Sequence, residues 1–417
     1  MKIGIISDTH IGDKNSTIIK GTTSGNYQTS DKFDALTSRI FDNNSNKPLD
    51  YLILNGDILD FAINSFHGAC IQARPFFQKI KERKLADHII YIPGNHDKDI
   101  WDALEWNVNV TMKMENNLDP TEFIRKQTGV LDLNIPFPDL DTEKGFSLDK
   151  INNPSEDSFI YGLFKDHKKE DQIQISIVYP NLYIKAGNEN ILITHGHLLE
   201  QAWTIASELF QGIGGIPPKV GLEEIEAYNT PITSMICTAL GQSGNLTTLL
   251  AKLESQIYMD DYTLLETVVS QVADRLEPIL LKTGVTFIDN LISKEIRNLI
   301  INLAKNSTKS KYRDQFLNDN GVQERFHKFY DVSCIDGAGH GVPPPNKIIF
   351  GHTHEVMGTL NIPSLNVKPF LNPSTTIKST TIDLYNSGGW VKNNSNNNAA
   401  IIFVDSNGTI NVQQIDI

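Results

Sequence analysis

Cysteine is scarce in this sequence of 417 residues, and long hydrophobic runs are absent. The three cysteines, Cys70, Cys237 and Cys334, lie far apart and form no CxxC pair, which argues against a disulfide framework and against a zinc site built from thiolates. No run approaches the roughly 18 apolar residues that a membrane-spanning helix needs. The apolar stretch in the N-terminal MKIGIISDTH is too short for a signal peptide. We therefore expect a cytoplasmic protein without a transmembrane segment.

Basic residues are also in deficit. Lys and Arg number 37 against 50 Asp and Glu, which gives a formal net charge of −13. Such a balance disfavours nonspecific attraction to a phosphate backbone, so nucleic acid is not the expected partner. The hydrophobic content of 40% allows a large core, either in one large domain or in a domain that carries insertions.

Five short apolar runs are present, and each is followed directly by polar residues that can bind metal. Runs of this length bounded by glycine predict buried strands, and side chains two apart in an extended segment point the same way. The runs and their polar ends are KIGIIS before Asp8-Thr9-His10, DYLILN before Gly56-Asp57, HIIYIP before Gly94-Asn95-His96-Asp97, NILIT before His195-Gly196-His197, and KIIF before Gly351-His352-Thr353-His354.

Helical spacing appears between the first three runs. Asp31 is the expected N-cap of a helix with Phe33 and Ile40 on one face, and Phe76 and Ile80 indicate a second helix. Strands that alternate with helices predict an α/β sheet, in which binding residues gather beyond the carboxyl ends of the strands.

Three further stretches are less regular. Alternating apolar residues over 171–196 predict a β-meander that leads into His195. Residues 106–169 are polar and contain several prolines, so we expect an irregular insertion. Residues 198–331 have apolar residues at helical spacing along much of their length, which predicts helices. Most such helices simply pack on a core, while the alternatives are a lid over the site and an oligomer contact.

The residues at the strand ends form a set of candidate metal ligands. Taken singly, Asp8 could cap a turn and Asp57 could end a strand, but the joint pattern favours metal binding. Mixed oxygen and nitrogen donors suit manganese, iron, cobalt, nickel or zinc, and they are numerous enough for two ions, with Asp57 able to bridge. The candidates are Asp8, His10, Asp57, Asn95, His195, His352 and His354.

The blocks D-x-H, GD-x-x-D, GNHD, HGH and GHTH, in this order, resemble those of the calcineurin-like metallophosphoesterases. The resemblance implies two mostly parallel sheets packed as a β-sandwich and flanked by helices, a four-layer α/β/β/α arrangement. It covers the beginning and the end of the chain. We therefore predict a catalytic domain formed by residues 1–197 and 332–417, with 198–331 as a large helical insertion.

The resemblance also implies a role for each site residue. One ion would be held by Asp8, His10, Asp57 and His354, and a second by Asp57, Asn95, His195 and His352. A hydroxide bridging the ions would attack phosphorus in line. His96, oriented by Asp60, would stabilise the transition state or protonate the leaving group. His197 is expected beside the ions as a substrate contact or as a support for a ligand, and Asp97 is expected to be structural.

The sequence indicates the substrate less closely than it indicates the metal ligands. NGDILDF and IPGNHDK lack the arginines with which related protein phosphatases hold phosphate. The blocks look closest to bacterial phosphoesterases of the sugar-nucleotide pyrophosphatase type, which implies a small-molecule or lipid-linked phosphomonoester or diester, with manganese the favoured metal. SDTHIGD resembles DNA-repair nucleases, against which the acidic balance argues. A non-catalytic scaffold with this fold is the other alternative, although every ligand position is filled.

Overall fold

The computed structural model describes most of the two ends of the chain and parts of its middle. The described residues are 2–118, 125–135, 146–148, 160–163, 173–199, 221–234, 237–238, 242, 252, 256, 261, 263–264, 266–267, 320–362, 382–392 and 398–417. Among these residues, no helix has both the length and the apolar character needed to cross a membrane.

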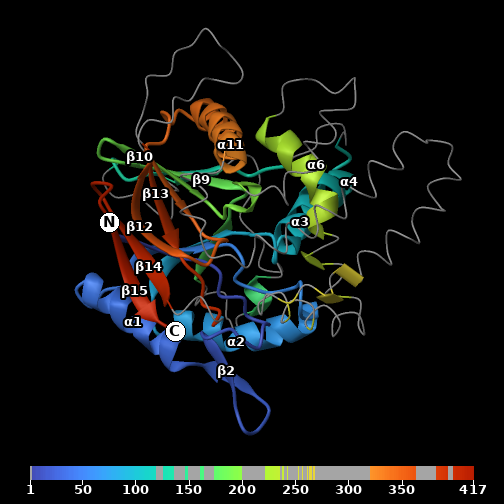
Figure 1. The fold of residues 1–417 in the computed structure, drawn as a ribbon. Helices are drawn as coiled ribbons and strands as arrows, with labels where there is room; N and C mark the ends of the chain where they lie inside the picture. The colour runs from blue at the N-terminus through green and yellow to red at the C-terminus, as the bar shows by residue number, and fades with distance from the viewer. Residues whose placement is uncertain are drawn as a thin grey trace, which may run out of the picture.

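Two large sheets form the centre of the fold (Figure 1). In the first, neighbouring strands are β15 (Ile410–Asp416), β14 (Asn398–Asp405), β1 (Lys2–Ile6), β4 (Leu49–Asn55), β5 (Ala86–Ile92) and β8 (Gln174–Ile177). In the second they are β12 (Val356–Ile362), β13 (Ile382–Ser387), β11 (Lys347–Phe350), β10 (Glu189–Thr194), β9 (Asn181–Ala186), β6 (Gly129–Asp132) and β7 (Phe146–Leu148).

Helices cover the outer faces of both sheets. The described helices are α1 (Asp31–Asn43), α2 (Phe66–Glu82), α3 (Asp99–Trp106), a π-helix (Asn107–Thr111), α4 (Met112–Glu115), α6 (Leu222–Ser234) and α11 (Asn320–Gly339), with 3-10 turns at Tyr161–Leu163 and His197–Leu199. A small hairpin joins β2 (Ile19–Gly21) to β3 (Tyr27–Thr29). In Figure 1, α1 and α2 lie below the sheets and α11 lies above them.

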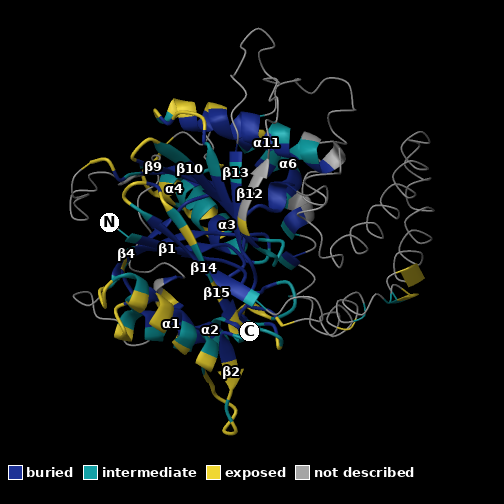
Figure 2. Cartoon of the chain, turned by 60° about the vertical axis from the view of Figure 1, so that its left-hand side comes forward, coloured by how far each residue is buried: buried dark blue, intermediate teal, exposed yellow. Residues whose placement is uncertain are grey.

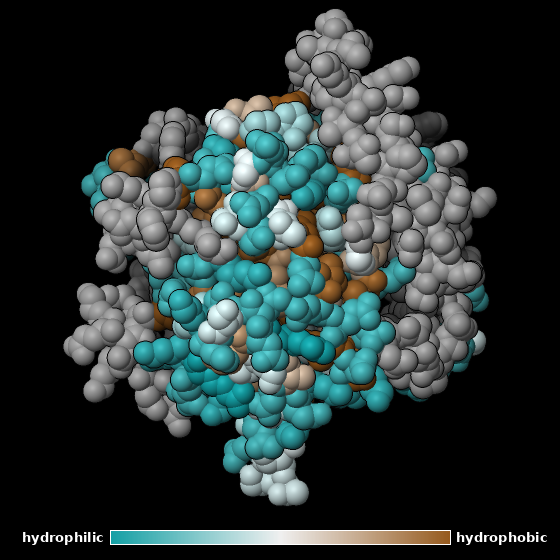
Figure 3. Space-filling view, turned by 90° about the vertical axis from the view of Figure 1, so that its left-hand side faces the viewer, coloured by the Kyte–Doolittle hydropathy of each residue, from teal (hydrophilic) through white to brown (hydrophobic). Residues whose placement is uncertain are grey.

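Alternation along the strands divides the core into three layers. In β1, Ile3 and Ile5 face the second sheet, whereas Ile6 packs with the helices α1 and α2. In β10, Ile191 lies between the sheets, and Leu192 packs with residues of α11. Figure 2 shows the strands as the buried centre of the molecule, and Figure 3 shows a largely hydrophilic outer face. The predicted two-sheet α/β sandwich is confirmed, since each strand face buries its own apolar set.

Both sheets contain more antiparallel strand pairs than the predicted, mostly parallel arrangement. The neighbours β1, β4, β5 and β8 run parallel, but β14 pairs antiparallel with β1, and β15 pairs antiparallel with β14. In the second sheet β10, β11 and β13 are parallel, and antiparallel pairs lie on either side of them.

The structure corrects three predictions about local secondary structure. Ser30, rather than Asp31, caps α1, because its side chain accepts a hydrogen bond from the Lys32 backbone N–H at 3.0 Å. The meander was wrong in part: β9 and β10 form a hairpin, but β8 pairs with β5 in the other sheet. Pro180 lies between β8 and β9 and has no N–H to donate to a continuous ladder. Within 106–169, β6 is a full member of the second sheet.

Much of the predicted helical insertion lies outside the described residues. The described parts of 198–331 include α6 and the first part of α11. Helix α11 continues past residue 331 to Gly339, so the expected boundary at 331 falls within a helix. The domain division therefore stays a prediction.

Candidate active site

The carboxyl ends of five strands meet at one edge of the sandwich. Three of these strands, β1, β4 and β5, belong to the first sheet, and β10 and β11 belong to the second. The two sheets are tied together there, because Asn55 at the end of β4 donates from Nδ2 to the carbonyl oxygen of Thr194 at the end of β10, at 3.0 Å. All of the predicted site residues follow these strands directly and are brought together by the fold.

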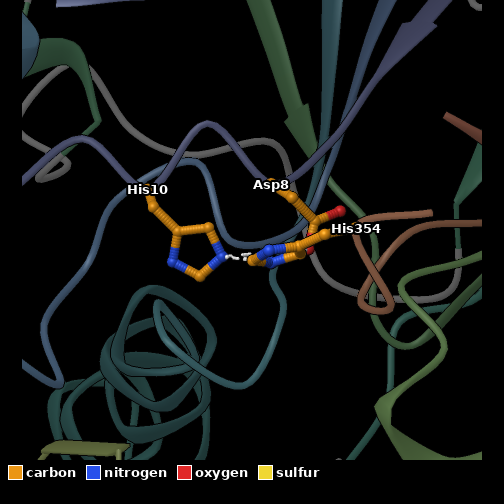
Figure 4. Close-up of side chains that lie close together, drawn as sticks. All are labelled: Asp8, His10 and His354. Atoms are coloured by element: carbon orange, nitrogen blue, oxygen red, sulfur yellow. Dashed lines mark hydrogen bonds and ion pairs between the residues drawn. The ribbon is translucent and has the colours of Figure 1, made fainter. Parts of the chain in front are cut away.

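The first group of potential ligands contains Asp8, His10 and His354 (Figure 4). The Nε2 atoms of the two histidines lie 2.9 Å apart. Asp8 Oδ1 lies 3.4 Å from Nε2 of His354 and 3.9 Å from Nε2 of His10. All three side chains therefore direct a donor atom toward one point, although they come from opposite ends of the chain.

The second group contains Asp57, His195 and His352. Nε2 of His195 lies 3.1 Å from Asp57 Oδ2 and 3.1 Å from Oδ1 of Asn95. On its other side, Nδ1 of His195 lies 3.0 Å from the carbonyl oxygen of Asn55, which orients the ring with Nε2 toward the group. Asn95 thus joins this group through its side-chain oxygen.

One oxygen of Asp57 faces both groups. Oδ2 lies 3.1 Å from Nε2 of His195 and 3.8 Å from Nε2 of His10. Ligand atoms that each lie about 2.1 Å from one ion are separated by about 3 to 3.5 Å, and several separations in both groups are close to this range. The donor set and its spacing are suited to binding divalent metal ions.

The backbone is strained where it presents these ligands. Positive φ angles occur at Asp8 (52°), His10 (42°), Asp57 (52°), His352 (65°) and His354 (56°). Residues with a side chain rarely adopt this conformation, and it costs on the order of 1–3 kcal/mol each in unfavourable cases. Five of the seven candidate ligands share it, which is the pattern expected when geometry at a functional site outweighs local stability.

Glycines in the same blocks make room for ligands from other blocks. A Cβ on Gly56 would lie 2.5 Å from Cγ of His195, and one on Gly94 would lie 2.7 Å from the backbone nitrogen of Asp57. A Cβ on Gly351 would overlap the carboxylate of Asp8. Each glycine of GD, GNHD and GHTH therefore allows a close approach that no larger residue permits.

Asp97 holds the loops that carry these ligands. It is buried, and its carboxylate accepts hydrogen bonds from the backbone nitrogens of Asp57 (3.2 Å), Ile58 (2.8 Å), Leu59 (3.3 Å) and Gly94 (2.6 Å) and from the Tyr91 hydroxyl (2.6 Å). These five bonds fix the loop after β4 against the loop after β5, in line with the structural role expected for Asp97.

Asp60 lies between two histidines with different expected roles. Its Oδ1 is 3.1 Å from Nδ1 of His96, and its Oδ2 is 2.8 Å from Nδ1 of His10. Burial opposes a charge on His96, but the carboxylates of Asp60 and Asp57 outweigh this and raise its pKa well above the usual value. Burial likewise opposes ionisation of Asp60, yet His96 and His10 lower the pKa of its carboxyl. The contact with His10 had no sequence signal.

His197 lies beside the second group without joining it. Its ring centroid is 5.6 Å from that of His195 and 6.4 Å from that of His352. Glu226 of α6 faces it, and Oε1 of this residue lies 3.9 Å from Nε2 of His197. Sequence reasoning missed Glu226, because a glutamate within a helical stretch carries no motif.

Residues from 198–331 contact the site loops at further points. Nδ2 of Asn95 lies 3.5 Å from Sγ of Cys237, and the Thr238 hydroxyl donates to Asp99 at 2.6 Å. Cys237 is buried and, like the other two cysteines, forms no disulfide. These contacts place part of the predicted insertion against the site, while its role as a lid stays a prediction.

The comparison with known families agrees with this geometry. The calcineurin-like phosphoesterase family matches residues 1–213, just over half of the 417 residues. The match includes four of the five blocks, and the fifth, at His352 and His354, lies beyond it and is brought to the site by the fold. No curated protein matches the chain. The sequence match and the assembled histidine and aspartate groups show that this chain belongs to the calcineurin-like phosphoesterase family, whose members are metal-dependent phosphoesterases.

Proposed function

We propose that this enzyme uses two divalent metal ions to hydrolyse a small-molecule or lipid-linked phosphomonoester or diester. The observation that carries the proposal is the position of Asp57, one oxygen of which faces a histidine of each ligand group at 3.1 and 3.8 Å. A carboxylate so placed can serve two ions at once. Manganese is the metal we favour, and iron, cobalt, nickel or zinc would also suit these carboxylate, amide and imidazole donors.

The residues divide into two sets around the shared carboxylate. Asp8, His10, Asp57 and His354 would hold one ion, and Asp57, Asn95, His195 and His352 would hold the other. When bound, two such ions lower the pKa of a water nucleophile and neutralise charge on the attacked phosphoryl group. They also account for anion binding by a protein with a net charge of −13, since bound cations set the local field.

His96 is placed to act on the substrate. Its side chain is 22% exposed, whereas the Asp60 side chain that contacts it is only 1% exposed. Because Nδ1 faces Asp60, Nε2 is the nitrogen that can reach a phosphoryl or leaving-group oxygen. The raised pKa favours the protonated imidazole, which can donate a proton or a hydrogen bond to developing negative charge.

The pairing of Lys98, a lysine close to the site, supports a small substrate. Lys98, directly after the GNHD block, is buried and its Nζ is paired with Asp102 at 2.5 Å. It is therefore committed to α3 rather than to a phosphate chain. Together with the acidic balance, this favours a substrate recognised through one phosphoryl group over a long polyanion.

The test is hydrolysis of p-nitrophenyl phosphate and bis-p-nitrophenyl phosphate by metal-stripped protein reloaded with manganese. We expect activity that Asp57→Asn abolishes and that Asp42→Asn, an exposed and equally conservative change on α1, leaves intact. The ratio of the two rates reports whether monoesters or diesters are preferred. Absence of hydrolysis with manganese, iron, zinc, nickel and cobalt would contradict the proposal and favour the scaffold alternative.

A further inference from the structure

A pair of buried polar side chains lies next to the second ligand group, and metal binding does not account for it. The pair, called the polar pocket below, consists of His197, in the turn after β10, and Glu226 of α6, which are 2% and 4% exposed. His197 is in ring contact with His195 and His352, so a group bound in the pocket would adjoin the place where a phosphoryl group is held.

One buried polar atom of each side chain lacks a partner. Nδ1 of His197 and Oε1 of Glu226 form no hydrogen bond with a described residue. The distance of 3.9 Å between Nε2 and Oε1 is too long for a direct hydrogen bond. Buried polar atoms are nearly always paired in folded proteins, so this gap points to a missing ligand.

A hydrogen bond from Tyr179 fixes the orientation of the Glu226 side chain. The Tyr179 hydroxyl donates to Oε2 at 2.5 Å, which leaves Oε1 as the oxygen presented to His197. Tyr179 is itself buried and stacks on Trp101, with ring centroids 5.2 Å apart. The carboxylate is therefore positioned by packed neighbours rather than free to turn toward another partner.

The charged groups around Glu226 indicate which kind of chemical group could bind between it and His197. Lys98 lies near Glu226, but its ammonium group is paired with Asp102, and Glu105 adds a further carboxylate nearby. An anionic ligand group is disfavoured by this acidic neighbourhood. A hydroxyl oxygen about 2.8 Å from each of the two facing atoms would donate to Oε1 and accept from an imidazole N–H.

We propose that His197 and Glu226 bind a hydroxyl group of the substrate, so that the ester cleaved at the adjoining ligand groups carries a polyol such as a glycerol or sugar unit. This inference rests on the proposed function, since it names the substrate class of the same site. A ligand without the hydroxyl would leave the buried carboxylate oxygen and imidazole unpaired. Sites built in this way reject the deoxy analogue strongly.

The test uses two phosphonates that cannot be hydrolysed, 3,4-dihydroxybutylphosphonate and butylphosphonate. Their affinities for manganese-loaded protein are measured by calorimetry, which requires no turnover. We expect the dihydroxy compound to bind about tenfold to a hundredfold more tightly, as a hydrogen bond to a charged group implies. Glu226→Gln keeps the shape and an oxygen for Tyr179, and it should reduce this ratio to about threefold or less.

The matched control is Glu224→Gln, the same change at an exposed position of the same helix, which should preserve the ratio. Equal affinities in the unaltered protein would overturn the proposal and indicate that ordered water fills the pocket. A ratio that survives Glu226→Gln would overturn it as well. Hydroxyl discrimination by a protein that does not cleave p-nitrophenyl esters would support the pocket and contradict only the proposed hydrolysis.

Discussion

Replacing Glu226 by glutamine should change how the stability of the folded protein depends on pH. Burial raises the pKa of the Glu226 carboxyl from 4.5 to about 7. Lys98 and the Tyr179 hydroxyl lower the pKa, and Asp102 and Glu105 raise it further. The folded protein therefore binds this proton more tightly than the unfolded chain does.

The difference in the pKa of Glu226 between the folded and unfolded states sets the direction and size of the change in stability with pH. Between pH 4.5 and 7 the folded state holds the proton that the unfolded state has released, so the contribution of Glu226 to stability falls as the pH rises. The shift is 7 − 4.5 = 2.5 pKa units, or about 3 kcal/mol at 1.36 kcal/mol per unit. His197 also faces Glu226, and burial lowers the pKa of its imidazole well below the usual value, which opposes a charge on this ring.

The assay is urea unfolding of the metal-free protein and of Glu226→Gln at pH 4.5 and pH 8. Contributions from the other titrating groups are shared and cancel in the difference between the two proteins. The unaltered protein should lose about 3 kcal/mol relative to the variant on going from the lower to the higher pH. Glu224→Gln should show less than about 0.5 kcal/mol of such change, as expected for an exposed side chain. A difference that is independent of pH, or that grows in the opposite direction, would show that the pKa of Glu226 is not raised in the folded protein.

Three further predictions concern the metal and catalytic residues. Gly94→Ala places a Cβ 2.7 Å from the backbone nitrogen of Asp57 and should weaken manganese binding by about tenfold to a hundredfold in a calorimetric titration, whereas Gly339→Ala, with no atom within 4 Å of the added Cβ, should not. Manganese at about 100 times its Kd should raise the free energy of unfolding of the stripped protein by about 2.7 kcal/mol for each site that it fills, and a chelator should reverse the gain; an unchanged melting curve would argue against metal binding. Asp60→Asn removes a carboxylate that raises the pKa of His96, so the alkaline limb of the rate profile should move to lower pH, and an unmoved limb would exclude His96 as the proton donor.

The sequence was most informative where structure depends on local pattern. Apolar runs of five to seven residues before D-x-H, GD and GNHD became strands because their alternate side chains face two different apolar layers. The candidate ligands could be named in advance for the same reason, since each directly follows such a strand. The error of one residue at the cap of α1 reflects competition between adjacent residues, Ser30 and Asp31, that both suit an N-terminus.

Only the three-dimensional fold shows which distant segments lie together. The runs ending at Thr194 and Ile177 look alike as sequence, yet one strand joins the second sheet and the other the first, because long-range pairing selects the partner of a strand. The same holds for the contact of Asp60 with His10 and for the position of Glu226 opposite His197. A local pattern records how a segment buries its own apolar face, whereas contacts between segments depend on how the two sheets and their helices pack, and that information is distributed over the whole chain.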